Sequence, residues 1–200
     1  MYLYGASGHA KVIIDILTNR EIDIQGVFDD DINIEKIFDY TIQPVPKEVE
    51  TLDGRFIISI GDNKIRKSLS EKYSLLFGSA IHSSCIMSDS VSIGDGTAIM
   101  ASAVINSSTL IGKHVIINTS ASIDHDCVIG DYVHISPSAC LCGGVQVGIG
   151  SHVGAGSVIL PGVNVGSWST VGAGCVVLSD VPAFSVVVGN PARILRELNK

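Results

Sequence analysis

Aliphatic residues recur at every sixth position through the second half of the chain. The series begins at Ile81 and reaches Val177 through seventeen consecutive aliphatic positions without an insertion. An α-helix repeats about every 3.6 residues and a plain strand about every 2, so neither accounts for this spacing. A glycine follows a residue of the series every 18 residues, at Gly94, Gly112, Gly130, Gly148 and Gly166. Three units of six residues therefore predict one coil of a parallel β-helix.

A second set of positions predicts a narrow interior for this β-helix. Four residues after an aliphatic position, the chain carries a small or β-branched side chain, in Thr97, Ala103, Thr109, Val115, Ala121, Cys127, Val133 and Ala139. Close packing requires such side chains beside the larger aliphatic ones. We expect the β-helix to span residues 79–180. Residues 181–200 should form its cap, an apolar strand followed by a short helix that begins near Pro191.

Residues 1–78 follow a different pattern. A short apolar strand leads into the glycine turn of "MYLYGASGHA", and the next segment, "KVIIDILTN", has the spacing of an amphipathic helix. Two more strands are predicted in "IDIQGVFDDD" and "RFIISIGDN", the second followed by a helix in "KIRKSLSEKY". This Rossmann-like β-α-β order places ligands beyond the carboxyl ends of the strands. Gly5 and Gly8 form only part of the dinucleotide fingerprint, and a plain turn explains their spacing equally well.

Composition excludes several classes of partner. Charged residues make up 16% of the chain and its net charge is −7, which argues against a nucleic-acid partner. No apolar run is long enough to span a membrane, and the first 20 residues lack the pattern of a signal peptide. We therefore expect a cytoplasmic protein whose five cysteines are free thiols. Cys140 and Cys142 have no second pair, so no metal clip is predicted there.

The stretch "ASIDHDCVIG" contains the clearest candidate for catalysis. His125 lies two positions beyond the inward Ile123, and we expect its side chain to leave the crowded interior. Neutral imidazole, with an ordinary pKa of about 6.5, is suited to accept a proton near neutral pH. A carboxylate on the other ring nitrogen would hold the required tautomer. Asp124 and Asp126 both flank the histidine, and we favour Asp126 for this role.

The chain resembles a known family over essentially its whole length. The opening "GASGHA", the six-residue repeat and the "GNPAR" segment at 189–193 are similar to those of hexapeptide-repeat sugar O- and N-acetyltransferases. Sialic acid O-acetyltransferases and nucleotide-diphosphate-amino-sugar N-acetyltransferases typify this family. The resemblance implies a left-handed β-helix, an exception to the usual crossover rule. It also implies acetyl-CoA as co-substrate, no metal, and a homotrimer with active sites between neighbours. Val104, Ile116 and Val158, which lie outside the inward series, support such an assembly indirectly.

The resemblance also implies which residues bind each ligand. Catalysis would fall to His125 as general base and Asp126 as its orienting partner. The nucleotide-sugar would be bound by Ser7, Gly8, His9, Asp29, Asp30, Ser59, Gly61 and Asn118, with Asp29 and Asp30 near the nucleoside and residues 59–61 beside the pyrophosphate. Coenzyme A would be bound by His134, Gly143, Ala155, Ala173, Asn190 and Pro191, with Gly143 near the thioester. Lys64 and Arg66 would either add charge beside the pyrophosphate or lie on a solvated helix face, and we favour the helix face.

These inferences favour an acetyl-CoA-dependent N-acetyltransferase acting on a nucleotide-diphosphate-linked amino sugar in bacterial surface-glycan biosynthesis. The amine can attack the thioester directly, so no cysteine nucleophile is needed and Cys127 is expected in the core. A sialic acid-type O-acetyltransferase is the main alternative, because no residue separates the two acceptors. A non-catalytic nucleotide-sugar-binding scaffold would not need His125 and Asp126. A γ-type zinc carbonic anhydrase would use histidines such as His114, His125, His134 and His152, but the H-x-x-x-x-H pair is absent.

Overall fold

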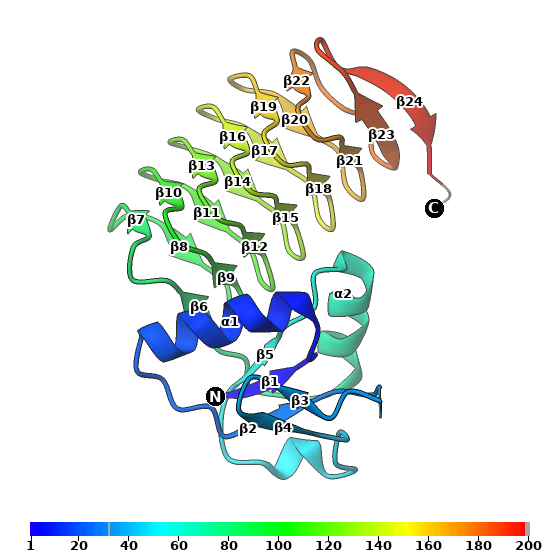
Figure 1. Cartoon of the computed structure of the whole chain (residues 1–200). Helices are drawn as coiled ribbons and strands as arrows, with labels where there is room; N and C mark the ends of the chain where they lie inside the picture. The colour runs from blue at the N-terminus through cyan, green and yellow to red at the C-terminus, as the bar shows by residue number, and fades with distance from the viewer. Residues whose placement is uncertain (32, 199–200) are drawn as a thin grey trace.

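The computed structural model describes residues 1–31 and 33–198 and has two parts, an N-terminal α/β unit and a long β-helix that extends from it (Figure 1). The elements of the α/β unit are β1 (Tyr2–Tyr4), α1 (Gly8–Asn19), β2 (Gly26–Phe28), β3 (Lys36–Ile37), β4 (Tyr40–Gln43), the 3-10 helix η1 (Val49–Thr51), β5 (Phe56–Ile58) and α2 (Asn63–Lys72). Neither α1 nor any other described helix is long and apolar enough to cross a membrane.

The N-terminal sheet confirms the predicted β-α-β arrangement. Its strand order is β3-β4-β2-β1-β5, and β1 pairs in parallel with both β2 and β5. The carboxyl ends of these three strands therefore meet at one edge, next to the glycine turn that begins α1. Leu3, Val27 and Ile57 of the three strands are fully buried beneath α1. The sequence pattern was thus sufficient to predict that these strand ends meet at one edge.

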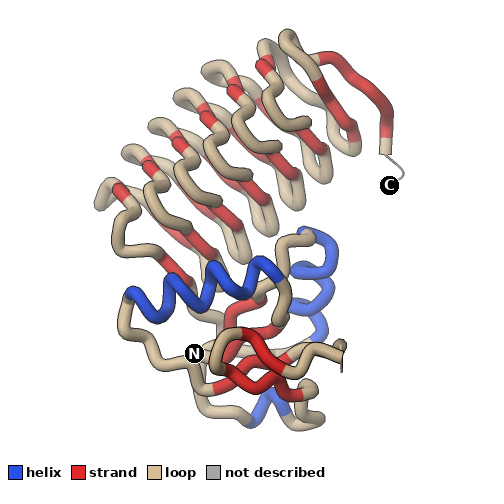
Figure 2. The backbone as a smooth tube through the Cα atoms, in the orientation of Figure 1, coloured by secondary structure: helices blue, strands red, loops and turns tan. Residues whose placement is uncertain are grey.

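The β-helix is built from seventeen strands of two residues each. They are β6 (Ala80–Ile81), β7 (Ile86–Met87), β8 (Ser92–Ile93), β9 (Ala98–Ile99), β10 (Val104–Ile105), β11 (Leu110–Ile111), β12 (Ile116–Ile117), β13 (Ser122–Ile123), β14 (Val128–Ile129), β15 (His134–Ile135), β16 (Cys140–Leu141), β17 (Gln146–Val147), β18 (His152–Val153), β19 (Val158–Ile159), β20 (Asn164–Val165), β21 (Thr170–Val171) and β22 (Val176–Val177). Figure 2 shows these short strands separated by regular turns.

The seventeen strands stack in parallel as three sheets of six, five and six strands, and the cap strands β23 and β24 extend the third sheet to eight. Partners lie one coil apart, as in Ile105 beside Ile123 and Ile123 beside Leu141. The predicted interior is confirmed, because the inward aliphatic residues from Ile99 onward and the small residues between them are buried. This is the left-handed parallel β-helix that the resemblance implied.

From Gly96 to Gly174, each corner of the β-helix contains one residue in the left-handed backbone conformation. Between Gly96 and Gly174, every sixth residue has a positive φ. Several of these residues are not glycine, among them His114 with a φ of 53° and Asp126 with a φ of 59°. These turns also bring the backbones of neighbouring coils close together. A Cβ on Gly130, for example, would lie 2.7 Å from the backbone nitrogen of Ile149.

The C-terminal cap differs from the prediction. The helix expected near Pro191 is wrong, because residues Arg193–Glu197 form strand β24, which pairs antiparallel with β23 (Ser185–Val188). β23 continues the eight-stranded sheet and offers a free row of backbone donors and acceptors. Pairing with this edge decides the conformation of the last segment, and local helix propensity is too weak to compete with it.

The two parts of the protein share a hydrophobic core. α1 packs on β6. The first coils of the eight-stranded sheet contribute the outward-facing Ala98 and Ile116 to the core of the α/β unit. Ile116 is only 1% exposed, so its apolar side chain is covered within one chain and does not indicate an oligomer. Val104 and Val158 remain partly exposed on the six-stranded sheet.

The packing predicts which aliphatic residues stabilise the β-helix. Ile123→Ala removes a fully buried side chain and should lower the free energy of unfolding by about 2–5 kcal/mol. Leu110→Ala, at an outward position that is 51% exposed, should change it by less than about 0.5 kcal/mol. Urea unfolding at one fixed protein concentration measures both. Equal losses for the two variants would contradict the inward assignment.

Candidate active site

His125 lies at a corner of the β-helix with its ring in contact with Asp126. The turn between β13 and β14 places the His125 side chain outside the core, where it is 60% exposed. Its Nδ1 lies 2.7 Å from Oδ2 of Asp126. Asp126 has a left-handed φ at this turn, and aspartate is one of the few residues that tolerate this backbone conformation. Asp126 is thus the carboxylate that contacts the ring.

Asp124 has a different role at the same corner. Its Oδ1 accepts hydrogen bonds from the backbone N–H of His125 and from Nδ2 of Asn106, both at 2.9 Å. The hydrogen bond to Asp126 raises the pKa of His125 above its ordinary value, and the charge of Asp124 adds to this. Asp124 therefore supports the turn and the local field, while Asp126 contacts the imidazole.

The His125 ring lies against Gly143 of the following coil. This glycine occupies the equivalent corner one coil on, where the N–H of Gly144 donates to the carbonyl of His125. A Cβ at Gly143 would lie 2.7 Å from both Nε2 and Cε1 of His125. A side chain at this position would displace the ring from its Asp126-bound geometry. The structure brings together the predicted residues His125, Asp126 and Gly143.

A second group of predicted residues lies on the eight-stranded sheet. Nε2 of His134 is 3.1 Å from Nδ2 of Asn118, and the ring centroids of His9 and His134 are 6.5 Å apart. His152 stacks on His134 at 4.8 Å and bonds to Oγ of Ser136. Burial lowers the pKa of His9 to about 4 and that of His134 to about 3, so both rings are neutral near pH 7.

The start of α1 is open to a ligand. Ser7 and Gly8 are exposed, and the Ser7 side chain makes no capping bond to the helix. The backbone N–H groups at such a helix terminus suit a phosphate. His9, in the first turn of α1, is largely buried, and its Nε2 has no hydrogen-bond partner within the described part of the chain. These three residues remain candidates for the nucleotide-sugar.

Three other predicted substrate residues are engaged within the α/β unit. Oδ2 of Asp29 accepts from the N–H of Ala6 at 2.7 Å, and Oδ2 of Asp30 accepts from the hydroxyl of Tyr4 at 2.7 Å. Ser59 is fully buried, and its hydroxyl donates to the carbonyl of Gly5 at 2.6 Å. This hydroxyl therefore holds the glycine turn, and the placement of residues 59–61 beside the pyrophosphate stays a prediction. Asp29 also lines a cavity of about 380 Å³.

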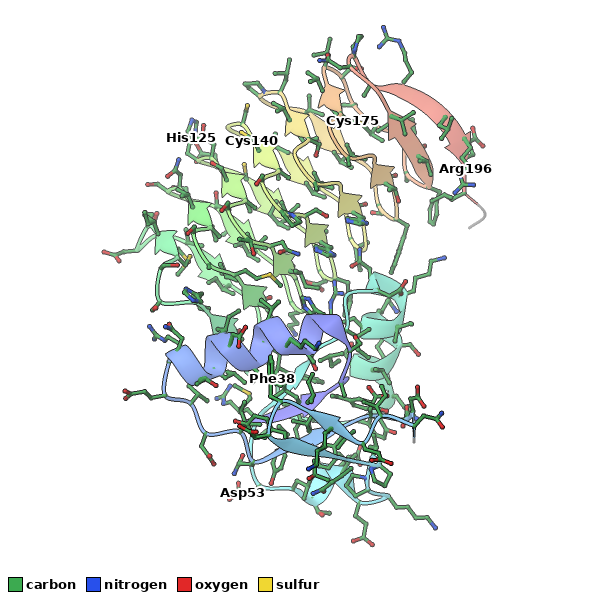
Figure 3. The ribbon with its side chains drawn as sticks, in the orientation of Figure 1. Phe38, Asp53, His125, Cys140, Cys175 and Arg196 are labelled. Carbon is green, nitrogen blue, oxygen red and sulfur yellow. The ribbon has the colours of Figure 1, made fainter. Side chains whose placement is uncertain are left out.

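The predicted coenzyme contacts lie at two different corners. Ala155 and Ala173 are exposed on the turns from the eight-stranded to the six-stranded sheet, above Asn118. Asn190 and Pro191 are exposed in the turn between β23 and β24. Gly143, in contrast, shares the corner of His125. Figure 3 shows His125 at the outer edge of the β-helix, away from α1 and the lower unit.

A cleft between the two parts of the protein contains several of the residues described above. It has a volume of about 480 Å³, and its lining includes Gly61, Lys64, His134, His152 and Trp168. His152 and Trp168 were not predicted as part of a cleft, since nothing in the repeat marks an outward residue as a cleft residue. The position favoured for Arg66, on a solvated helix face, is wrong because this side chain is 1% exposed. Its burial depends on contacts that are distant in sequence.

The histidines considered for a zinc site are divided among different faces. His125 lies at the corner from the six-stranded to the five-stranded sheet, His134 and His152 on the eight-stranded sheet, and His114 at the third corner. Residues 1–31 and 33–198 contain no group of three histidine, cysteine, aspartate or glutamate side chains arranged to hold a metal ion.

Comparison with known proteins gives closely similar structures. Residues 1–73 match the family described as the PglD N-terminal domain. The chain is 35% identical to perosamine N-acetyltransferase from Caulobacter crescentus, a variant of which was solved with CoA and GDP-perosamine. The match covers 98% of this chain and 96% of that chain, with a TM-score of 0.93. The acetyltransferase domain of PglB from Neisseria gonorrhoeae, solved with acetyl coenzyme A, is 31% identical, with 97% and 98% covered and a TM-score of 0.90.

A further match is to part of a much longer protein. An uncharacterised protein of Acanthamoeba polyphaga mimivirus is 35% identical over 100 residues, which are 47% of this chain and 20% of the viral protein. This match therefore covers a small portion of its relative, whereas the two solved acetyltransferases match along nearly their whole length.

The contact between His125 and Asp126 predicts a specific titration. Asp126→Asn removes the anionic acceptor on Nδ1, so the pKa of His125 should fall toward its ordinary value. Asp124→Asn should lower it less, because Asp124 bonds the backbone and not the ring. NMR titration of the imidazole signals measures both shifts. A larger shift in Asp124→Asn would assign the orienting role to the other carboxylate.

Proposed function

The chain belongs to the hexapeptide-repeat acetyltransferases of nucleotide-linked amino sugars, and we propose that His125 is its general base for acetyl transfer from acetyl-CoA to the sugar amine. The observation that carries this proposal is the exposed His125 ring, held through Nδ1 by Asp126, with Nε2 next to Gly143. Nε2 is the nitrogen left to accept a proton from a substrate.

The proposed reaction is a direct attack without an acyl-enzyme. The amine nitrogen forms a bond to the thioester carbon while His125 Nε2 takes the proton that nitrogen loses. The C–S bond of the tetrahedral intermediate then breaks, and the proton passes to the departing thiolate, giving an amide and free CoA. Asp126 stabilises the imidazolium that forms between these steps. Cys127 is fully buried in the core, consistent with a mechanism that needs no thiol nucleophile.

We assign the two ligands to different surfaces. The nucleotide-sugar would bind at the carboxyl edge of the N-terminal sheet, with its phosphates near Ser7, Gly8 and Gly61. Coenzyme A would lie along the turns that expose Ala155 and Ala173, where small side chains leave room for the pantetheine arm. His134 and Asn118 lie between these surfaces on the eight-stranded sheet.

The proposed site is incomplete in one chain. His125 and Gly143 lie at one corner of the β-helix, and Asn118, Ala155 and Ala173 lie at the next. A neighbouring copy that brings its His125 corner to this second corner would complete the site. The six-stranded sheet between the corners carries Val104 and Val158 without a covering element, which suits such packing. We therefore propose a homotrimer, acting in the cytoplasm to supply an acetylated sugar for a surface glycan.

Removal of the base should slow catalysis without abolishing substrate binding. His125→Ala should lower kcat by about 10²–10⁴-fold in assays with acetyl-CoA and UDP-, GDP- or dTDP-linked amino sugars, with modest changes in KM. His82→Ala, which changes a histidine of a lower coil outside the proposed site, is the matched control. A His125→Ala enzyme with near-normal kcat would remove this residue from the mechanism.

Mixed oligomers test whether two copies share the site. Ala155→Trp should block the coenzyme surface while leaving His125 intact, so each variant alone should be nearly inactive. When the Ala155→Trp and His125→Ala chains are co-expressed in equal amounts, random pairing should restore about a quarter of the sites. Activity of the purified mixture is compared with that of each variant alone. Absence of any recovery in a demonstrated mixed oligomer would place the whole site within one chain.

A further inference from the structure

Arg66 is a buried cation between the two parts of the protein. Its Nε donates to the carbonyl of His114 at 2.7 Å, and its Nη2 donates to the carbonyl of Tyr132 at 2.9 Å and to Oδ1 of Asn63 at 2.8 Å. Its Nη1 donates to the carbonyls of Ile60 and Gly61 at 3.1 and 3.2 Å. The guanidinium thus joins two coils of the β-helix to the loop that follows β5.

These five acceptors explain how a charge is accommodated there. Within the described residues, Arg66 forms no ion pair with a carboxylate, and it is 1% exposed. A buried cation is tolerated when its donors are all used, and the fork of arginine can serve several carbonyls at once. Burial lowers the pKa of Arg66 to about 10, so the side chain remains charged near pH 7. Lysine has fewer donors and could not satisfy the same set.

The regular corners of the β-helix supply the acceptors on one side. His114, Tyr132 and Gly150 occupy equivalent positions in successive coils, each with a positive φ, of 53°, 60° and 70°. Their carbonyls accept no hydrogen bond from the backbone of residues 1–31 and 33–198, so this row of oxygens is free for side chains. Arg66 binds the first two, and Nδ2 of Asn63 donates to the third at 3.0 Å. The first turn of α2 therefore has one defined register on the β-helix.

On the other side, Arg66 fixes the orientation of two peptide groups. A trans peptide is planar, with its C=O and N–H pointing in opposite directions. Because the carbonyls of Ile60 and Gly61 face the guanidinium, the N–H groups of Gly61 and Asp62 point away from it. Neither N–H has an acceptor in the described part of the chain. Both are donors of the kind that bind phosphate oxygens, at the carboxyl end of β5.

We propose that Arg66 is a positioning residue for the nucleotide-sugar, which it orients through the Ile60–Gly61 and Gly61–Asp62 peptides and not by direct contact. The inference rests on the proposed function, since it takes the diphosphate of that substrate as the anion bound beside Gly61. By holding the same loop to His114 and Tyr132, Arg66 also fixes the substrate relative to the β-helix that carries the proposed chemistry. Its influence on coenzyme A should be small, because Ala155 and Ala173 lie at another corner.

The test compares nucleotide and coenzyme binding in matched variants of the full chain. Isothermal titration of the wild type with GDP and with UDP first identifies the nucleotide that binds. Arg66→Lys retains the charge but not the five hydrogen bonds. It should weaken binding of that nucleotide about tenfold or more, while CoA affinity stays within about twofold. Lys67→Gln, the next residue of α2, is the control because Lys67 pairs only with the exposed Glu71 and should change neither affinity.

Thermal unfolding separates positioning from a purely structural role. If Arg66→Lys only loosens the fold, its melting temperature falls while the folded protein binds nucleotide with wild-type affinity, and the proposal is overturned. Equal weakening of nucleotide and CoA would overturn it as well. Should Arg66→Lys fail to fold, Asn63→Ala decides. This variant removes one acceptor of Arg66 and one hydrogen bond to the carbonyl of Gly150. It should weaken nucleotide binding by a smaller factor and leave CoA binding unchanged. Unchanged nucleotide affinity would contradict the proposal. If the wild-type protein binds both ligands but transfers no acetyl group, the proposed function is refuted. The comparison of nucleotide and CoA affinities among the variants still tests the role of Arg66.

Discussion

The left-handed residue at every sixth position is the constraint on which the rest of the structure depends. It turns the chain sharply enough for each strand of two residues to be followed by another on the next face. Because the turn is the same at each corner, the side chain just before it always projects from the edge of the β-helix. His125 occupies this place at one corner, followed by Asp126 in the left-handed conformation. The proposed base and its partner are thus consequences of the repeat.

The same turn also determines how the α/β unit is attached. Each left-handed residue leaves its carbonyl free of the ladder between coils, and at one corner these oxygens receive Arg66 and Asn63. The contact of α1 with Ile116 buries apolar surface between the two parts. The hydrogen bonds from α2 fix the position of this helix along the β-helix. Together they hold the expected nucleotide-sugar surface at a fixed place on the β-helix. The proposed base lies at a different corner, which is why the account requires a second copy.

The sequence predicted features that are local and periodic. The six-residue series identified inward and outward positions, and the order of residues at 124–126 was enough to suggest the contact that the structure shows between His125 and Asp126. It failed where distant segments decide the outcome. The last strand pairs with β23 instead of forming a helix, and Arg66 is buried by carbonyls of residues 114 and 132. None of these partners lies near its residue in the sequence.

The chemical nature of the product tests the central claim most directly. The enzyme is incubated with acetyl-CoA and UDP-, GDP- and dTDP-linked amino sugars, in parallel with the corresponding sugars that carry a hydroxyl in place of the amine. Mass spectrometry follows addition of one acetyl group, and hydroxylamine treatment distinguishes an amide from an ester. The account predicts acetylation of an amine-bearing sugar nucleotide only, with a product that resists hydroxylamine. Acetylation of the hydroxyl sugar, or a product that hydroxylamine cleaves, would contradict it.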